Sequence, residues 1–61
     1  MTPEQMKELR KRLGLSISQA AKCVHVTDRS WLRYESGDRK IPDAIVHLFH
    51  VQNGLKYPPN D

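Results

Sequence analysis

The sequence predicts an all-α fold, a compact bundle of four short helices. Apolar residues recur along it at spacings of three and four, and nowhere does an alternation with a period of two persist. Capping residues and prolines stand at the expected helix starts, and glycines stand near the expected ends. The length of 61 residues, 38% of them apolar, suits one small globular domain and leaves no room for a second.

The first helix is expected to begin after Thr2, because Thr2 and Gln5 can form a capping box and Pro3 suits the first helical position. Gly14 is expected to end it. The apolar stripe of this helix comprises Met6, Leu9 and Leu13. Its opposite face is expected to carry the basic residues Lys7, Arg10, Lys11 and Arg12. These side chains form either a solvated face that stabilises the helix C-terminus or, in part, a set of phosphate contacts.

A second capping box, formed by Ser16 and Gln19, predicts the start of the second helix. The inward stripe of this helix comprises Ile17, Ala20, Ala21 and Val24. The alanines are small enough to let a neighbouring helix approach closely. His25 and Val26 follow as a short break in the helical pattern.

The third helix is expected over residues 28–36, with Thr27 as its cap and Gly37 as its left-handed C-terminal residue. Trp31 and Tyr34, which are three residues apart, are expected to face the core. The side chains expected to point outward are those of Arg29, Ser30, Leu32 and Arg33.

The fourth helix is expected to start at residues 41–43, with Pro42 in its first turn, and to stop at residues 53–54. Its core stripe is expected to comprise Ile41, Ile45, Leu48 and Phe49. A second apolar seam comprises Ala44, Val51 and Leu55. A surface helix of a monomer needs only one apolar face, so the second seam predicts a homodimer contact, completed by Leu55 and Tyr57.

The second and third helices, joined by a short break, form the helix-turn-helix pattern. Ala21 lies where the two helices cross, and a larger side chain there would wedge them apart. His25 occupies the turn position at which glycine is usual, and histidine is among the few side chains enriched at positive φ. Val26 and Trp31 are expected to pack beneath the turn and to fix the angle of the third helix.

The charge balance points to a polyanionic partner. Ten Lys and Arg residues against seven Asp and Glu residues give a net charge of +3. The single cysteine, Cys23, excludes an intrachain disulfide and a cysteine-based zinc site. No paired-carboxylate cleft, glycine-rich phosphate loop or nucleophile–base pair stands out, so we expect no enzyme, no cofactor and no metal. No apolar run approaches a membrane span, and the expected location is the cytoplasm.

The start of the third helix offers the side chains best suited to contact DNA. They are Thr27, Asp28, Arg29, Ser30 and Arg33. Arg29 can donate two hydrogen bonds to a guanine edge, unless it pairs with Asp28 or Glu35 on the surface. Asp28 can accept from a cytosine amine or can simply compensate the helix dipole. Arg39 and Lys40 suit phosphate contact, and a merely solvated loop is the alternative.

Residues 15–42 resemble the helix-turn-helix of the Cro and phage-repressor-like (xenobiotic-response-element) family. The resemblance rests on residues 16–21 (Ser-Ile-Ser-Gln-Ala-Ala), 26–30 (Val-Thr-Asp-Arg-Ser) and 33–37 (Arg-Tyr-Glu-Ser-Gly), followed by Arg39, Lys40 and Pro42. A narrower resemblance, on residues 18–21 and 29–37, is to the anti-CRISPR-associated (Aca-type) repressors of phages and other mobile elements. The fold that it implies is lambda-repressor-like, with the third helix in the major groove and dimers on palindromic sites.

The resemblance also implies roles for individual residues. Those implied to face bases or nearby phosphates are Thr27, Asp28, Arg29 and Arg33. Those implied to meet the DNA backbone at the start of the second helix are Ser16, Ser18 and Gln19. The family often has glutamine as the first residue of this helix, where this sequence has Ile17, so Gln19 is the nearest substitute for that contact. The family often has a fifth helix as well, whereas this tail contains prolines, so the fourth helix or the tail must supply the dimer surface.

The predicted function is that of a sequence-specific repressor that binds double-stranded DNA as a homodimer on a palindromic operator, with no small-molecule effector evident. It is expected to regulate its own operon in a phage or mobile element, such as an anti-CRISPR operon. An antitoxin-like or adaptor module for protein interaction is the alternative, and a nucleic-acid chaperone without sequence preference is a third. Residues 1–54 are expected to form the DNA-binding domain and residues 55–61 a short tail.

Overall fold

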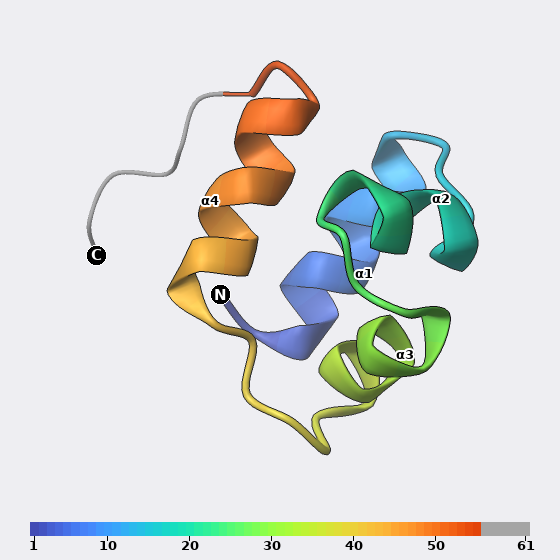
Figure 1. The fold of residues 1–61 in the computed structure, drawn as a ribbon, viewed down its shortest axis with the longest axis vertical. Helices are drawn as coiled ribbons and strands as arrows, with labels where there is room; N and C mark the ends of the chain where they lie inside the picture. The colour runs from blue at the N-terminus through green and yellow to red at the C-terminus, as the bar shows by residue number, and fades with distance from the viewer. Residues whose placement is uncertain (56–61) are drawn as a thin grey trace.

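The computed structural model describes residues 1–55, and in them it shows four helices and no strand (Figure 1). The helices are α1 (Pro3–Arg12), α2 (Ile17–Cys23), α3 (Asp28–Ser36) and α4 (Asp43–Gln52). α3 packs against both α1 and α2, and α2 also packs against α4. The predicted all-α bundle is therefore confirmed. None of the helices in residues 1–55 is long and apolar enough to cross a membrane.

The first three helices begin at their predicted caps. Thr2 Oγ1 accepts a hydrogen bond from the Gln5 backbone N–H at 3.1 Å, and the Gln5 side chain accepts one from the Thr2 N–H at 2.8 Å. Ser16 and Gln19 form the same reciprocal box at the start of α2, and the Thr27 side chain caps α3. Each cap satisfies backbone donors that the first turn of a helix leaves without partners.

The core is centred on three fully buried side chains, Met6, Trp31 and Phe49, which come from α1, α3 and α4. The rings of Trp31 and Phe49 lie 5.1 Å apart. Ala20 and Ala21 of α2 are also fully buried in this cluster. Because alanine is small, α2 can pack closely on the other helices, as the sequence predicts.

α4 starts slightly later than expected, because Pro42 is its N-cap residue and not part of its first turn. Phe49 in the helix and Ile41 ahead of it are buried, as predicted. The other two residues of the predicted stripe, Ile45 and Leu48, are only partly buried. The side of α4 that faces the core is therefore rotated from the predicted one.

Two residues outside the predicted stripe, Val46 and His50, are buried instead, with 6% and 5% of their surface exposed. They are four residues apart and so lie on one side of the helix. The Nδ1 atom of His50 lies 2.7 Å from the Val46 carbonyl oxygen. The predicted stripe does not include His50, although an imidazole ring can be buried when its nitrogen atoms find partners.

Candidate nucleic-acid interface

The chain turns sharply between α2 and α3 at His25, whose φ of 57° is left-handed, as predicted. Backbone hydrogen bonds close the turn onto the end of α2. The Val26 N–H donates to the Ala21 carbonyl at 3.0 Å, and the His25 N–H donates to the Lys22 carbonyl at 3.3 Å. The Val26 side chain is partly buried against the core. These contacts fix the angle at which α3 leaves the turn, which is the geometry of a helix-turn-helix.

An exposed polar contact joins α2 to the first turn of α3. Ser18 Oγ donates to Asp28 Oδ2 at 2.7 Å. A serine hydroxyl has a single proton to donate. In this arrangement that proton goes to Asp28, so Ser18 has none left for a phosphate oxygen. Ser18 thus lies where it can orient the Asp28 carboxylate, and its contact with the DNA backbone stays a prediction.

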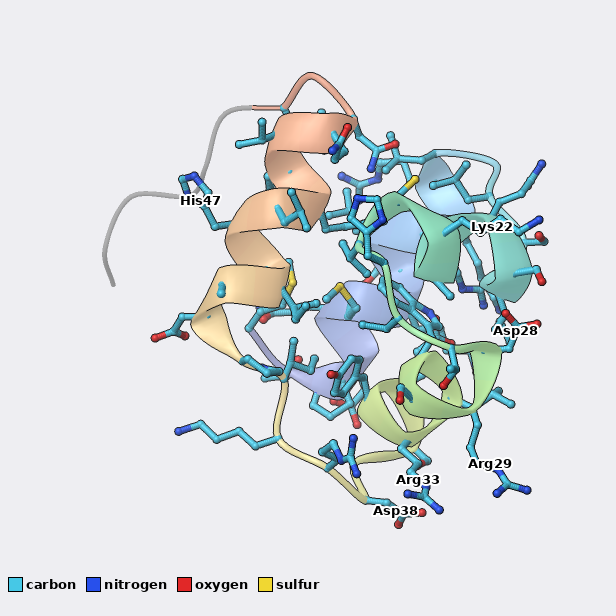
Figure 2. The ribbon with its side chains drawn as sticks, in the orientation of Figure 1. Lys22, Asp28, Arg29, Arg33, Asp38 and His47 are labelled. Atoms are coloured by element: carbon cyan, nitrogen blue, oxygen red, sulfur yellow. The ribbon has the colours of Figure 1, made fainter. Side chains whose placement is uncertain are left out.

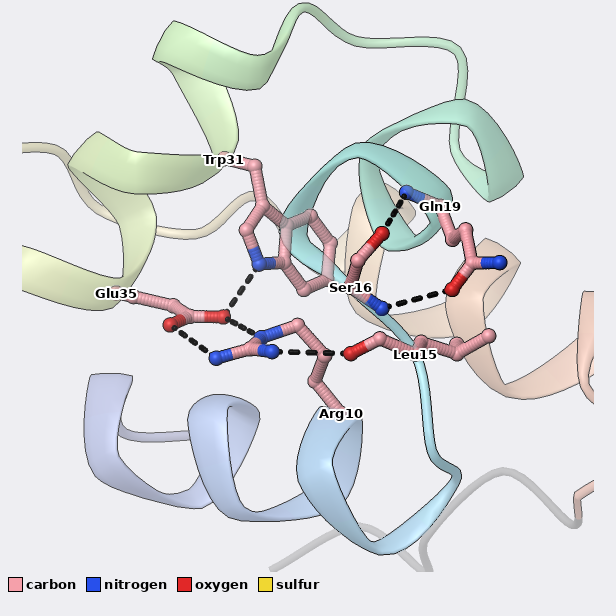
Figure 3. Close-up of polar contacts among 6 residues, drawn as sticks. All are labelled: Arg10, Leu15, Ser16, Gln19, Trp31 and Glu35. Atoms are coloured by element: carbon pink, nitrogen blue, oxygen red, sulfur yellow. Dashed lines mark hydrogen bonds and ion pairs between the residues drawn. The ribbon is translucent and has the colours of Figure 1, made fainter.

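The capping box at the start of α2 engages two other predicted backbone contacts (Figure 3). The Ser16 N–H donates to Gln19 Oε1 at 2.9 Å, and the Gln19 N–H donates to Ser16 Oγ at 3.1 Å. Neither the hydroxyl proton of Ser16 nor the amide nitrogen of Gln19 takes part in the box. Both groups are donors on exposed residues, as a contact with phosphate requires.

The C-terminal half of α3 is anchored by a buried ion pair with α1 (Figure 3). Arg10 Nε donates to Glu35 Oε2 at 2.6 Å, and Arg10 Nη2 donates to Glu35 Oε1 at 3.3 Å. Arg10 Nη1 donates to the Leu15 carbonyl at 3.0 Å, and Trp31 Nε1 donates to Glu35 Oε2. The two charged side chains are only 11% and 7% exposed. This network therefore links the end of α1, the segment before α2 and the second half of α3.

The prediction that placed Arg10 on the basic, outward face of the first helix is wrong. Arg10 lies four residues after Met6 and three before Leu13, so its spacing places it on the apolar side of α1. The prediction assigned its position by charge and overlooked this spacing.

The network also bears on the alternative partners for Arg29. Within residues 1–55, Arg29 forms an ion pair with neither Asp28 nor Glu35.

The face of α3 that points away from the core is polar, with one exception. Its exposed residues are Asp28, Arg29, Leu32, Arg33 and Ser36. Figure 2 shows the side chains of Arg29 and Arg33 extending away from the body of the molecule. They are four residues apart and so project from one side of the helix. Two guanidinium groups are thus presented together, as the sequence predicts, while Leu32 beside them has no role in that prediction.

Thr27 and Ser30 form a small hydroxyl pair at the start of α3. Thr27 Oγ1 accepts from the Ser30 N–H at 3.1 Å and also lies 3.1 Å from Ser30 Oγ, to which it donates. The Ser30 residue is partly buried, whereas Thr27 is exposed. The pair lies beside the outward face of α3. Its hydrogen bonds cap the first turn of the helix.

The loop after α3 brings further positive charge to the C-terminal end of that helix. Gly37 adopts a left-handed φ of 86°, which ends α3 as predicted. The Arg39 N–H donates to the Arg33 carbonyl at 3.3 Å, so the loop is tied to the last turn. Arg39 and Lys40 are both exposed. The structure therefore places them at the end of α3 opposite the one that carries Asp28.

Metal ligands do not gather in the described part of the chain. No three His, Cys, Asp or Glu side chains of residues 1–55 lie close enough to hold a metal ion. Cys23 is partly buried, and His50 is buried while His47 is exposed. The candidate site is therefore the outward face of α3, together with the start of α2 and the loop after α3.

Two known proteins are similar in sequence to this chain. The chain is 39% identical over 46 residues to the Aca2 repressor of Pectobacterium phage ZF40, in an alignment that covers 74% of this chain and 40% of that protein. It is 34% identical over 56 residues to the Type II methyltransferase M.MspI of a Moraxella species, covering 92% of this chain and 13% of that enzyme. The chain thus spans less than half the length of either relative. No solved structure matches it.

The family itself is identified by a match of residues 4–49 to the model of a helix-turn-helix domain. The matched segment starts in α1, ends in α4 and includes the whole of the turn at His25. The predicted likeness to the Aca-type repressors is confirmed by the similarity to the Aca2 repressor. The chain belongs to the helix-turn-helix domain family, whose members are DNA-binding domains, and it is similar to a phage repressor of the Aca type.

Proposed function

We propose that this chain is a transcriptional repressor that reads double-stranded DNA with the outward face of α3. The observation that carries the proposal is the direction of Arg29 and Arg33, which extend into solvent (Figure 2), while the neighbouring Glu35 is paired with Arg10 (Figure 3). Two arginine forks on one side of a helix suit the major groove, where an arginine donates two hydrogen bonds to a guanine edge. Repression then follows from occupation of a promoter and needs no chemistry. The similarity to a phage repressor supports this role.

Other residues around α3 contact a base or the DNA backbone in this proposal. Asp28, oriented by Ser18, accepts from a base at the edge of the groove, and the hydroxyl pair of Thr27 and Ser30 lies beside a phosphate. The remaining backbone contacts come from exposed groups on either side of α3, which are Ser16, Gln19, Arg39 and Lys40. Contacts of this kind fix the register of a protein on DNA but carry no sequence information.

Substitution of Arg29 and Lys40 separates reading from positioning. Arg29→Ala is expected to cost about 1–3 kcal/mol per half-site and to relax the preference at one base pair in each half. Lys40→Ala is expected to weaken specific and nonspecific binding alike and to flatten the plot of log K against log salt by roughly 0.9 for each phosphate that the protein no longer neutralises. Binding to mutant operators at several salt concentrations distinguishes the two. If Arg29→Ala instead lowers affinity equally for every sequence, Arg29 contacts phosphate and is not the reading residue.

The proposed repressor is a homodimer that uses the outer side of α4. Ala44 and Val51 of the predicted seam are exposed, with Val51 at 55%, and Leu55 is partly buried. Tyr57, also predicted at this contact, lies outside the described residues. A two-fold dimer gives one recognition helix per half-site, with centres one helical turn (~34 Å) apart on an inverted repeat.

Val51→Asp tests the dimer, because it places a charge in the middle of the proposed contact. The variant is expected to remain folded, since Val51 is exposed, but to shift to monomer in sedimentation and to lose operator affinity. Val51→Ala serves as the milder control. One protomer per operator for the wild type, together with unchanged binding by Val51→Asp, would refute the dimer.

The regulated genes belong, in this proposal, to the operon of a phage or mobile element that encodes the protein, such as an anti-CRISPR operon. An inverted repeat immediately upstream of the reading frame supports autoregulation if the protein lowers expression of a reporter placed behind it. Unchanged reporter expression, or co-purification with a partner protein and no DNA binding, would favour the adaptor alternative.

A further inference from the structure

Leu32 is a large apolar side chain on the outward face of α3. It is 50% exposed, although most leucines of the described chain pack at least partly against the core. It lies three residues after Arg29 and four residues after Asp28, so the three side chains are neighbours on the helix surface. The other exposed residues of this face are polar or charged. A leucine in this place interrupts a surface that otherwise suits hydrogen bonding.

If α3 lies in the major groove, as in the proposed function, the Leu32 side chain contacts a base edge there. A helix that brings Arg29 to a base edge also brings the residue three positions later into the groove, where water leaves both side chains. Base edges in the major groove carry hydrogen-bond donors and acceptors, and the 5-methyl group of thymine is the one apolar group there larger than a C–H. Leucine against a polar edge would desolvate that edge without giving it a partner, which is unfavourable. Leucine against the methyl group buries apolar surface on both sides.

We infer that Leu32 packs on the 5-methyl group of a thymine in each half-site and so selects a T·A pair close to the base pair that Arg29 reads. The inference rests on the proposed function, because it requires α3 to lie in the major groove. It adds a specificity-determining residue that makes no hydrogen bond to DNA.

Removal of single methyl groups from the DNA tests this contact. Duplexes enriched by the full chain from a random-sequence pool provide the probe, and each thymine is replaced in turn by uracil, which keeps every hydrogen bond. The wild type is expected to lose affinity about three- to fivefold per half-site at one thymine position, the effect of burying one methyl group. Leu32→Ala is expected to bind the thymine and uracil duplexes equally well.

Two further variants serve as matched controls. Leu32→Met keeps an apolar side chain and is expected to retain the sensitivity to uracil. Arg29→Ala is expected to lose affinity yet to retain the same sensitivity, because it leaves the leucine in place. Since Leu32 is exposed, its replacement by alanine is expected to leave the thermal unfolding midpoint nearly unchanged, so a loss of binding reports on the contact with DNA.

The outcomes distinguish this inference from the proposed function. If the pool yields a preferred sequence but every uracil substitution costs the same in the wild type and in Leu32→Ala, the methyl contact is absent and only the inference fails. If Leu32→Ala weakens all duplexes alike, with no coupling to any thymine, Leu32 packs on the sugar backbone and the inference is again wrong. If no sequence is enriched and the wild type binds all duplexes equally, sequence-specific reading itself fails, and the inference fails with it.

Discussion

The two ends of α3 are held in different ways. At the N-terminal end the contacts are exposed hydrogen bonds: the local cap from Thr27, and the bond from Ser18 of α2 to Asp28. At the C-terminal end, the side chain of Glu35 is largely covered and is paired with Arg10, which lies 25 residues earlier in the sequence. Exposed hydrogen bonds contribute about 1 kcal/mol each, whereas the loss of one partner of a buried ion pair costs several times more.

This difference separates stability from recognition along one helix. The C-terminal end fixes α3 to α1, and a change there is expected to unfold or loosen the domain. The N-terminal end carries Asp28 and Arg29, which the proposed function places on DNA. Changes at that end are expected to alter binding while the fold persists. A helix anchored at one end in this way can vary its reading residues without endangering the domain.

The largest effect is expected from breaking the buried pair. Glu35→Leu leaves the Arg10 charge buried beside the single carbonyl of Leu15, and it also removes the acceptor of Trp31 Nε1. The expected cost is about 3–5 kcal/mol. Because the core of a domain this small rarely supplies more than about 3–5 kcal/mol of stability, the variant should be largely unfolded at room temperature. Circular dichroism and the fluorescence of Trp31, the one tryptophan, measure this.

Two controls accompany Glu35→Leu. The double substitution Arg10→Met with Glu35→Met removes both charges and is expected to recover most of the lost stability. Glu8→Leu changes an exposed glutamate of α1 and should alter the free energy of unfolding by no more than about 0.5 kcal/mol. A double variant as unstable as Glu35→Leu would show that the unpaired Arg10 charge is not what destabilises Glu35→Leu, and that the lost acceptor of Trp31 Nε1 or the packing of these side chains is.

The same contrast explains which parts of the fold could be predicted from the sequence. The caps and the turn at His25 depend on residues three or four positions apart, so their residue types alone indicate them. The ion pair of Arg10 and Glu35 joins residues that are far apart in the sequence. Nothing in the sequence marks them as partners, so each is expected to be a separate surface charge. The spacing of Arg10 from Met6 was the available signal, because it indicates the buried side of α1 without naming the partner.

The candidate site also contains features that local spacing predicts and features that depend on how the helices pack. The exposure of Arg29 and Arg33 follows from the helix period once Trp31 is placed in the core, and it was predicted correctly. The bond between Ser18 and Asp28 depends on how closely α2 and α3 approach, and no local pattern gives that distance. Its effect is to commit the Ser18 proton, which the resemblance to the repressor family assigns to the DNA backbone.

An intermediate effect is expected at the N-terminal end of α3. Thr27→Ala removes the hydroxyl that caps the Ser30 N–H, and the expected cost is about 1 kcal/mol. Thr27→Ser keeps the hydroxyl and should cost only a few tenths of a kcal/mol. Denaturant titration of both variants gives the free energies. A cost for Thr27→Ala that equals the cost of Glu35→Leu would remove the proposed difference between the two ends of α3.

The smallest effect, and one of opposite sign, is expected at the turn before α3. The left-handed φ of His25 strains any residue with a Cβ atom, and glycine adopts it freely. His25→Gly is therefore expected to stabilise the domain by roughly 0.5–1 kcal/mol, because the greater freedom of glycine in the unfolded chain offsets part of the relief. His25→Ala keeps the strain and should not stabilise, which makes it the matched control.

Since His25 is exposed and the turn geometry is retained, affinity for DNA should stay within about twofold in His25→Gly. A lower denaturation midpoint for His25→Gly than for the wild type would mean that a contact of the imidazole outweighs the backbone strain, and the N-terminal end of α3 would then depend on more than local backbone geometry.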